Sequence, residues 1–173
     1  MEDSPVFLVV GGSGGIGAAT ARQLSSQGHR VVVTGRETGR LAALAADTGA
    51  SAYELEARDS SAVDKVFHEV HSSHGRLDGV VNCAGSILLK PAHLVTDKEF
   101  DDTIAANLTT AFNVLRAAAR LMMRQPGGGS IVLCSSVAAR RGLINHEAIA
   151  AAKAGSKVWR FRRRQATRGI KSA

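Results

Sequence analysis

A glycine-rich loop near the amino terminus contains the clearest chemical pattern in the sequence. Residues 11–17 read Gly-Gly-Ser-Gly-Gly-Ile-Gly, follow a short apolar run and precede an alanine-rich helical pattern. Gly12, Gly14 and Gly17 fit the spacing GxGxxG. Glycines there allow the backbone to approach a pyrophosphate closely, and the following helix N-terminus supplies N–H groups and a favourable dipole. The loop is predicted to bind a dinucleotide; a merely flexible glycine-rich loop is the alternative.

An arginine stands where charge would select the nicotinamide nucleotide. An NAD-type site usually has an acid at the end of the second strand, where it binds the ribose 2′-hydroxyl. Here that region reads Val-Thr-Gly-Arg up to Arg36, and the first acid is Glu37. A guanidinium suits a 2′-phosphate. Arg36 therefore predicts that NADP(H) is preferred over NAD(H); a solvated arginine at a helix start is the alternative.

Five motifs follow one another in an order that resembles one protein family, the short-chain dehydrogenases/reductases. They are Gly11-x3-Gly15-Ile16-Gly17, Asn82-Cys83-Ala84-Gly85, Asn107 within residues 104–108, the run 131–136 that ends in Ser136, and Lys153 within residues 150–155. The resemblance covers roughly residues 5 to 155.

The resemblance implies a role for each matching residue. The cofactor-binding set would be Gly11, Ser13, Gly15, Ile16, Gly17, Arg36, Asp59, Asn82, Ala84, Gly85 and Lys153. Asp59 matches the position whose carboxylate meets the adenine amino group, and a helix N-cap is an equally open interpretation of it. The catalytic set would be Ser136, which orients the substrate oxygen, Asn107, which holds a water, and Lys153. The implied reaction is hydride exchange between a nicotinamide and a small alcohol or ketone.

The family's general acid/base is missing from its expected position. Family spacing places a tyrosine thirteen residues after Ser136 and four before Lys153, and both counts reach Ile149. Isoleucine has no acidic proton, and loss of a general acid/base typically costs about 10²–10⁴-fold in rate. Tyr53 is the only tyrosine and lies in the third strand region. We therefore expect an impaired oxidoreductase or, alternatively, a non-catalytic NADP(H)-binding protein.

Two further residues are alternatives within this constellation. His146 stands three residues before Ile149, one helical turn back, and its usual pKa range suits proton transfer near neutrality. A loop or capping role is the ordinary interpretation of this histidine. Ser135 is the alternative to Ser136, although the thirteen-residue spacing favours Ser136.

The elements that must position these residues alternate along the chain. The hydrophobic patterns predict strands at residues 6–10, 31–34, 52–55, 79–82 and 130–134, and helices at residues 15–27, 38–47, 62–74, 97–124 and from 147 onward. Continuous apolar strands and intervening helices indicate an α/β fold, a doubly wound parallel sheet of three-layer, Rossmann-like form. The family's later strands have no counterpart here, so we expect this sheet to be incomplete on its C-terminal side.

The distribution of charge divides the chain into two parts. Its 173 residues include 22 Lys and Arg against 15 Asp and Glu, a formal charge of +7. Seven of the basic residues lie in the last twenty, which contain no acid, so 15 of each sign remain in the first 153. We expect a dinucleotide-binding domain over residues 1–155 and a basic, atypical tail over residues 156–173. Arg160 and the arginines at 162–164 would make self-association through the last helix doubtful.

Other classes of function are less well supported by the sequence. Cys83 and Cys134 form no CxxC pattern, so neither a disulfide framework nor a zinc site is expected. No run approaches a membrane span and the acidic N-terminus is unlike a signal peptide, which predicts a cytoplasmic protein. The basic tail could bind nucleic acid in a salt-dependent, sequence-blind way, but no recognition motif accompanies it. The expected partner is a small carbonyl or alcohol substrate rather than a specific nucleic acid or a membrane.

Overall fold

The computed structural model describes the backbone of residues 4–169 and the side chains of that range except those at 158 and 160–169. Its sheet consists of five parallel strands in the order β3-β2-β1-β4-β5. The strands are β1 Val6–Val10, β2 Arg30–Gly35, β3 Ser51–Glu54, β4 Gly79–Asn82 and β5 Ser130–Leu133. The α-helices are α1 Gly15–Ser26, α2 Thr38–Thr48, α3 Ser60–His74, α4 Asp97–Ile104, α5 Thr110–Met122 and α6 Glu147–Gly169. The predicted doubly wound parallel sheet is confirmed.

One predicted helix differs from the observed structure. The pattern at residues 97–124 predicts a single α-helix, but a five-residue π-helical segment, η2 Ala105–Thr109, separates α4 from α5. Asn107 lies inside this segment, and its side-chain amide donates a hydrogen bond to the Thr103 carbonyl. Such π-bulges widen the helix locally and frequently occur at functional sites.

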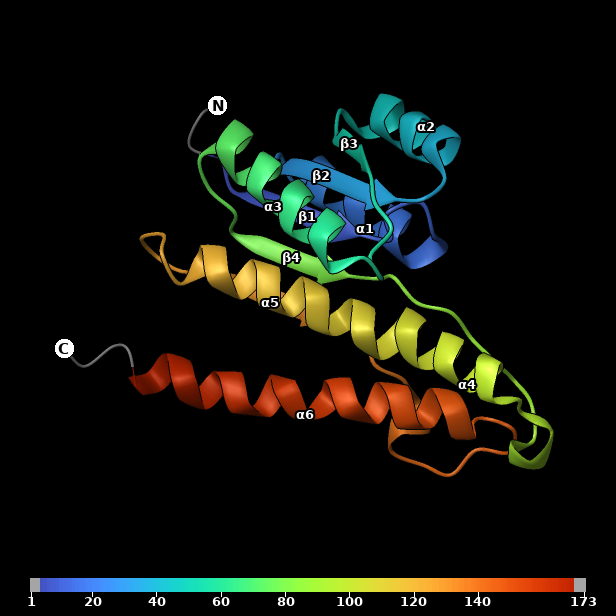
Figure 1. Ribbon diagram of the computed structural model, residues 1–173. Helices are drawn as coiled ribbons and strands as arrows, with labels where there is room; N and C mark the ends of the chain where they lie inside the picture. The colour runs from blue at the N-terminus through green and yellow to red at the C-terminus, as the bar shows by residue number, and fades with distance from the viewer. Residues whose placement is uncertain (1–3, 170–173) are drawn as a thin grey trace. The chain divides into compact units, whose positions relative to one another are not determined.

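Helices lie on both faces of the sheet, α3 on one and α1 on the other (Figure 1), and the apolar residues between the layers form two cores. Val6, Leu8 and Val10 belong to one core, together with residues of α3 and α5, among them Phe67 and Val114. Val9, one of the two intervening residues of β1, belongs to the other core and packs with residues of β2, α1 and α2. The continuous apolar strands predicted from the sequence therefore reflect burial on both faces.

The two edge strands, β3 and β5, are less well covered than the strands between them. The residues of both are exposed or half-buried, and Val132 of β5 has 51% of its surface accessible to solvent. By contrast, β1 lies in the middle of the strand order, and four of its five residues are buried. Because β3 is exposed as well, exposure does not distinguish the two edges, and an incomplete sheet beside β5 stays a prediction.

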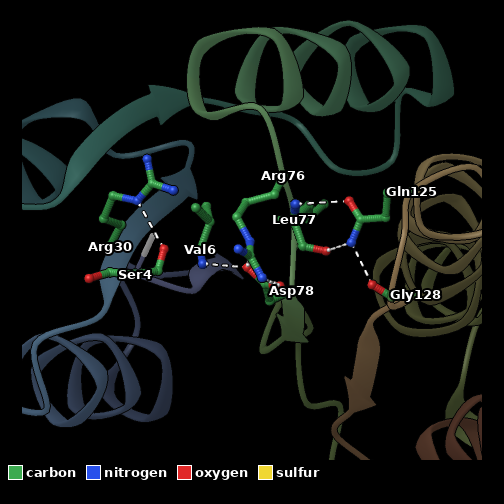
Figure 2. A network of polar contacts seen from close by, with 8 residues as sticks. All are labelled: Ser4, Val6, Arg30, Arg76, Leu77, Asp78, Gln125 and Gly128. Carbon is green, nitrogen blue, oxygen red and sulfur yellow. Dashed lines mark hydrogen bonds and ion pairs between the residues drawn. The ribbon is translucent and has the colours of Figure 1, made fainter. Parts of the chain in front are cut away.

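A polar network fixes the amino-terminal end of the sheet (Figure 2). Asp78 accepts hydrogen bonds from the Val6 N–H at 2.8 Å and from two nitrogens of Arg76 at 2.7 and 2.8 Å. Gln125 donates to the Leu77 carbonyl and accepts from the Leu77 N–H. The network therefore joins the starts of β1 and β4 to the loop after α5.

The described residues form two compact units. Residues 4–85 and 110–134 make the first, and residues 86–109 and 135–169 make the second. The first unit contains the whole sheet, whereas the second contains α4, η2, α6 and the short 3-10 helices η1 Ala92–Leu94 and η3 Val137–Ala139. The helix α6 runs without a break across residue 156, where the basic tail is expected to begin. The side chains of Arg160 and of the arginines at 162–164 lie outside the described residues.

Candidate functional site

The predicted dinucleotide loop is held by hydrogen bonds to the neighbouring strand. The N–H groups of Gly11 and Gly12 both donate to the Thr34 carbonyl near the end of β2, at 2.9 and 2.8 Å. The Gly14 N–H donates back to the Gly11 carbonyl at 3.2 Å. The loop is therefore a defined turn rather than a flexible glycine-rich linker.

Two glycines are required by the space around them. Gly11 has a φ of +80°, and a Cβ added there would lie 2.6 Å from the Ala84 nitrogen. A Cβ added at Gly17 would lie only 2.2 Å from the Gly11 carbonyl oxygen. Both positions therefore exclude any side chain, because the atoms that they would meet belong to the backbone.

The first turn of α1 leaves its N–H groups open to a ligand. Gly14 is the N-cap, and no side chain in the described part of the chain caps this turn. Gly15 has nothing within 4 Å of an added Cβ, and Ile16 is 70% exposed. A helix N-terminus whose N–H groups have no side-chain cap, and which small residues leave accessible, is the usual geometry of a phosphate-binding turn.

Arg36 and Asp59 follow β2 and precede α3, respectively. The Arg36 side chain is 69% exposed, and its Nη1 lies 3.6 Å from Oε2 of Glu56. Asp59 is the N-cap of α3, where its Oδ1 accepts from the N–H groups of Ser61 at 2.8 Å and Ala62 at 3.2 Å. The structure thus gives Asp59 a capping role, while its contact with an adenine stays a prediction.

The segment after β4 packs against the dinucleotide loop. Asn82 is 3% exposed, and its Oδ1 accepts from the Ala84 N–H at 3.1 Å, which forms a tight side-chain turn. The Cys83 N–H donates to the Val10 carbonyl at 2.8 Å. The loop after β1, Arg36 after β2 and residues 82–85 at the end of β4 thus lie at the carboxyl edge of the parallel sheet, where open α/β sheets bind their ligands.

The second unit holds the predicted catalytic residues. Asn107 is 1% exposed; its Oδ1 accepts from the Ser86 N–H at 3.2 Å, and its Nδ2 donates to the Ser86 hydroxyl at 3.2 Å. Ser136 precedes η3, and its Oγ accepts from the Ala138 N–H at 3.2 Å. A serine hydroxyl that accepts in this way still has its own proton to donate to a substrate oxygen.

The helix α6 brings Lys153 and Ile149 into the same unit. It packs against η2, which contains Asn107, and against η3, which directly follows Ser136. Ile149 is 3% exposed and lies on a buried stripe of α6 with Ala148, Ala152 and Ser156. At the position where the resemblance requires a phenol, the structure therefore has a packed aliphatic side chain.

The alternatives to these residues have identifiable contacts. The Ser135 hydroxyl donates to the Lys153 carbonyl at 3.2 Å and so contacts α6, while its role as the alternative to Ser136 stays a prediction. His146 precedes α6, and its Nδ1 lies 2.7 Å from the Ile144 carbonyl, a contact within the loop that fits the loop interpretation. Tyr53 lies in β3 of the first unit and packs beside that unit's larger core.

Sequence reasoning missed two features of the second unit. A Cβ added at Gly155 would lie 2.8 Å from a methyl carbon of Leu108, so this glycine lets α6 approach η2 closely. The small residues on either side of Lys153 were a signal for such an approach. The second feature is Lys90, which donates to both carboxylate oxygens of Glu99 at 2.7–2.9 Å. The hydrogen bonds from Lys90, together with those from Thr96, lower the pKa of Glu99 to about 2.

Comparison with known proteins agrees with this arrangement. The family profile described as short chain dehydrogenase matches residues 5–167. The chain is 39% identical over 150 residues to the 3-oxoacyl-[acyl-carrier-protein] reductase MabA of Mycobacterium avium, covering 86% of this chain and 55% of the relative. It is 34% identical over 158 residues to the D-threitol dehydrogenase of Mycolicibacterium smegmatis, covering 88% and 60%.

A solved structure extends the comparison to the fold. A metagenomic short-chain oxidoreductase in complex with NADP has a TM-score of 0.89 and 32% identity, covering 98% of this chain and 79% of that one. The chain spans between 55% and 60% of the length of the two curated relatives above. Within the described residues, no helix is both long and apolar enough to cross a membrane. The chain belongs to the short chain dehydrogenase family.

Proposed function

We propose that the chain is a cytoplasmic, NADP(H)-binding oxidoreductase for a small alcohol or ketone, in which Ile149 impairs proton transfer. The observation that supports it best is the loop after β1, where Gly11 and Gly17 admit no side chain and α1 begins without a side-chain cap. A bound nicotinamide dinucleotide would supply or accept the hydride.

The residues of the first unit would hold the nucleotide. The open N–H groups at the start of α1 suit a pyrophosphate, and Ser13 and residues 82–85 lie on the same carboxyl edge of the sheet. Arg36 would bind the 2′-phosphate. Its present partner, Glu56, is 3.6 Å away and both side chains are exposed, so exchanging this weak pair for a phosphate costs little.

Titration with NADPH and NADH tests this assignment. Losing a charged hydrogen bond costs about 1.5–3 kcal/mol, so Arg36→Ala should weaken NADPH binding roughly 10- to 150-fold and leave NADH binding nearly unchanged. Arg22→Ala is the matched control, because Arg22 is also an exposed arginine paired with a carboxylate, that of Asp47. Equal losses for NADPH and NADH in Arg36→Ala would contradict the 2′-phosphate role.

The residues of the second unit would handle the substrate oxygen and its proton. Ser136 would donate a hydrogen bond to that oxygen, and Lys153 would bind the ribose hydroxyls of the nucleotide. Lys153 has no phenol to acidify, since Ile149 stands four residues before it. Asn107 would contribute to a proton relay that lacks its usual acid.

Restoring the hydroxyl tests this part of the proposal. Ile149→Tyr should raise the rate of NADPH oxidation with a panel of small ketones by about 10²–10⁴-fold over the unaltered chain. Ile149→Phe is the matched control, because it adds the same ring without an acidic proton. If the two variants are equally active or equally inactive while both bind NADPH, residue 149 is not the proton-transfer position.

A non-catalytic NADP(H)-binding protein is the second candidate, and the packed, aliphatic side chain at position 149 favours it. Ile149 is 3% exposed and has no acidic proton, so it contributes to packing and not to proton transfer. Measurable ketone reduction by the unaltered chain would support the enzyme. Tight NADPH binding with no turnover would support the binding protein.

A further inference from the structure

Two cysteines lie side by side at the carboxyl edge of the sheet. Cys83 directly follows β4, and Cys134 directly follows β5. The parallel register pairs Asn82 with Leu133, and one further step pairs the two cysteines. The Cys134 N–H donates to the Asn82 carbonyl at 3.3 Å, which extends the backbone ladder to this point. Their Sγ atoms are 3.9 Å apart, although 51 residues separate them in sequence.

Both thiols lie on the same side of the sheet, and both are half-buried. Cys83 packs against the core formed with α1 and α2. Val132, two residues before Cys134, belongs to the same side of β5 by strand alternation and is 51% exposed. A small oxidant can therefore reach the pair from the uncovered side of β5.

The spacing allows a disulfide with only a small shift of the backbone at Cys83 and Cys134. Neighbouring strands lie about 4.7–4.9 Å apart, within the range of about 4.4–6.8 Å that a disulfide needs between Cα atoms. The two Sγ atoms would have to approach from 3.9 Å to about 2.05 Å, which side-chain rotation can provide.

We propose that Cys83 and Cys134 are a redox modification site that closes to a disulfide and lowers the affinity for the dinucleotide. This consequence rests on the proposed function. The backbone of Cys83 and Ala84 forms the wall beside Gly11, where an added Cβ would lie 2.6 Å from the Ala84 nitrogen. Because no free space separates these backbones, a small displacement of Cys83 on closure is passed to Gly11 and reshapes the loop that would bind the pyrophosphate.

Hydrogen peroxide can serve as the oxidant. One thiolate attacks a peroxide oxygen, so that an S–O bond forms, the O–O bond breaks and a water leaves after protonation. The second thiol sulfur then attacks the sulfenic sulfur; an S–S bond forms, the S–O bond breaks and a second water leaves. Two electrons and two protons pass from the cysteines to the peroxide, and a dithiol reductant reverses the change.

Mass spectrometry and nucleotide titration of the full chain test the proposal. At low protein concentration, peroxide should give a monomer that is two hydrogens lighter and has no thiol open to alkylation. Its NADPH affinity should fall by at least about five-fold, the lower end of typical coupling between sites, and dithiothreitol should restore it. Cys134→Ser, treated identically, should keep its NADPH affinity because Cys83 then has no partner to bond.

Each other outcome would overturn a stated part of the proposal. Thiols that stay open to alkylation, or that gain oxygen without joining, would exclude the disulfide. Unchanged NADPH affinity after closure, or an equal loss in Cys134→Ser, would exclude control through the disulfide. If the reduced chain binds no NADPH, the proposed function fails, while the mass measurement still decides whether the disulfide forms.

Discussion

Replacing Gly17 by alanine tests the geometry of the loop after β1. The added Cβ would lie 2.2 Å from the Gly11 carbonyl oxygen and 2.9 Å from the Gly12 Cα. Ordinary contact begins at 3.4 Å, so the oxygen would have to move by about 1.2 Å. Its neighbours are backbone atoms and cannot rotate away. Overpacking of this kind costs about 1–3 kcal/mol, which lowers the Tm of a domain of this size by about 2–12 °C.

The same displacement should weaken nucleotide binding. The Gly11 N–H is anchored on the Thr34 carbonyl, so a shift of Gly11 disturbs the whole turn. Losing one hydrogen bond to a charged phosphate costs about 1.5–3 kcal/mol, or roughly 10- to 150-fold in Kd for NADPH. Gly39→Ala is the control, because a Cβ added to this residue of α2 has nothing within 4 Å. A Gly17→Ala variant that melts and binds NADPH like the unaltered chain would refute the reasoning.

Three further predictions concern stability. Burial raises the pKa of Asp78, but hydrogen bonds from Arg76 and the Val6 N–H lower it more, so its folded pKa is below 3.8. The ionised Asp78 carboxylate should therefore stabilise the fold fully above pH 3.8, and this stabilisation should be lost as the pH falls through the folded pKa. Asp78→Asn should make melting temperatures less dependent on pH below about 4. Burial and the charge of Arg30 lower the pKa of His74 below 6.5, so stability should decline as the pH falls through 6.5, and His74→Gln should reduce that decline in the same melts. Asp59→Ala should cost about 1 kcal/mol in urea unfolding through loss of the α3 cap, whereas Asp59→Asn should keep it; equal losses would contradict the capping role.

Local patterns in the sequence were sufficient to predict the elements and the nucleotide loop. The predicted strands at residues 6–10 and 79–82 are observed unchanged as β1 and β4, and the other three differ by one residue at one or both ends. Gly49 and Gly75 end their helices in left-handed conformations, and Thr96 forms a capping box with Glu99, because caps depend on residues within a few positions. The glycine loop was recognisable for the same reason.

Contacts between distant residues were decided only by the tertiary structure. Asn107 is bonded to Ser86, Ser135 is bonded to the Lys153 carbonyl, and Cys83 meets Cys134. No local pattern predicts these pairs, because strand register and helix packing bring them together across 18 to 51 residues. The spacing of the resembled family predicts a general acid/base at position 149, and the structure shows that Ile149, which stands there, is buried. The sequence therefore determined which groups are present, and the packing of the elements determined which of them meet.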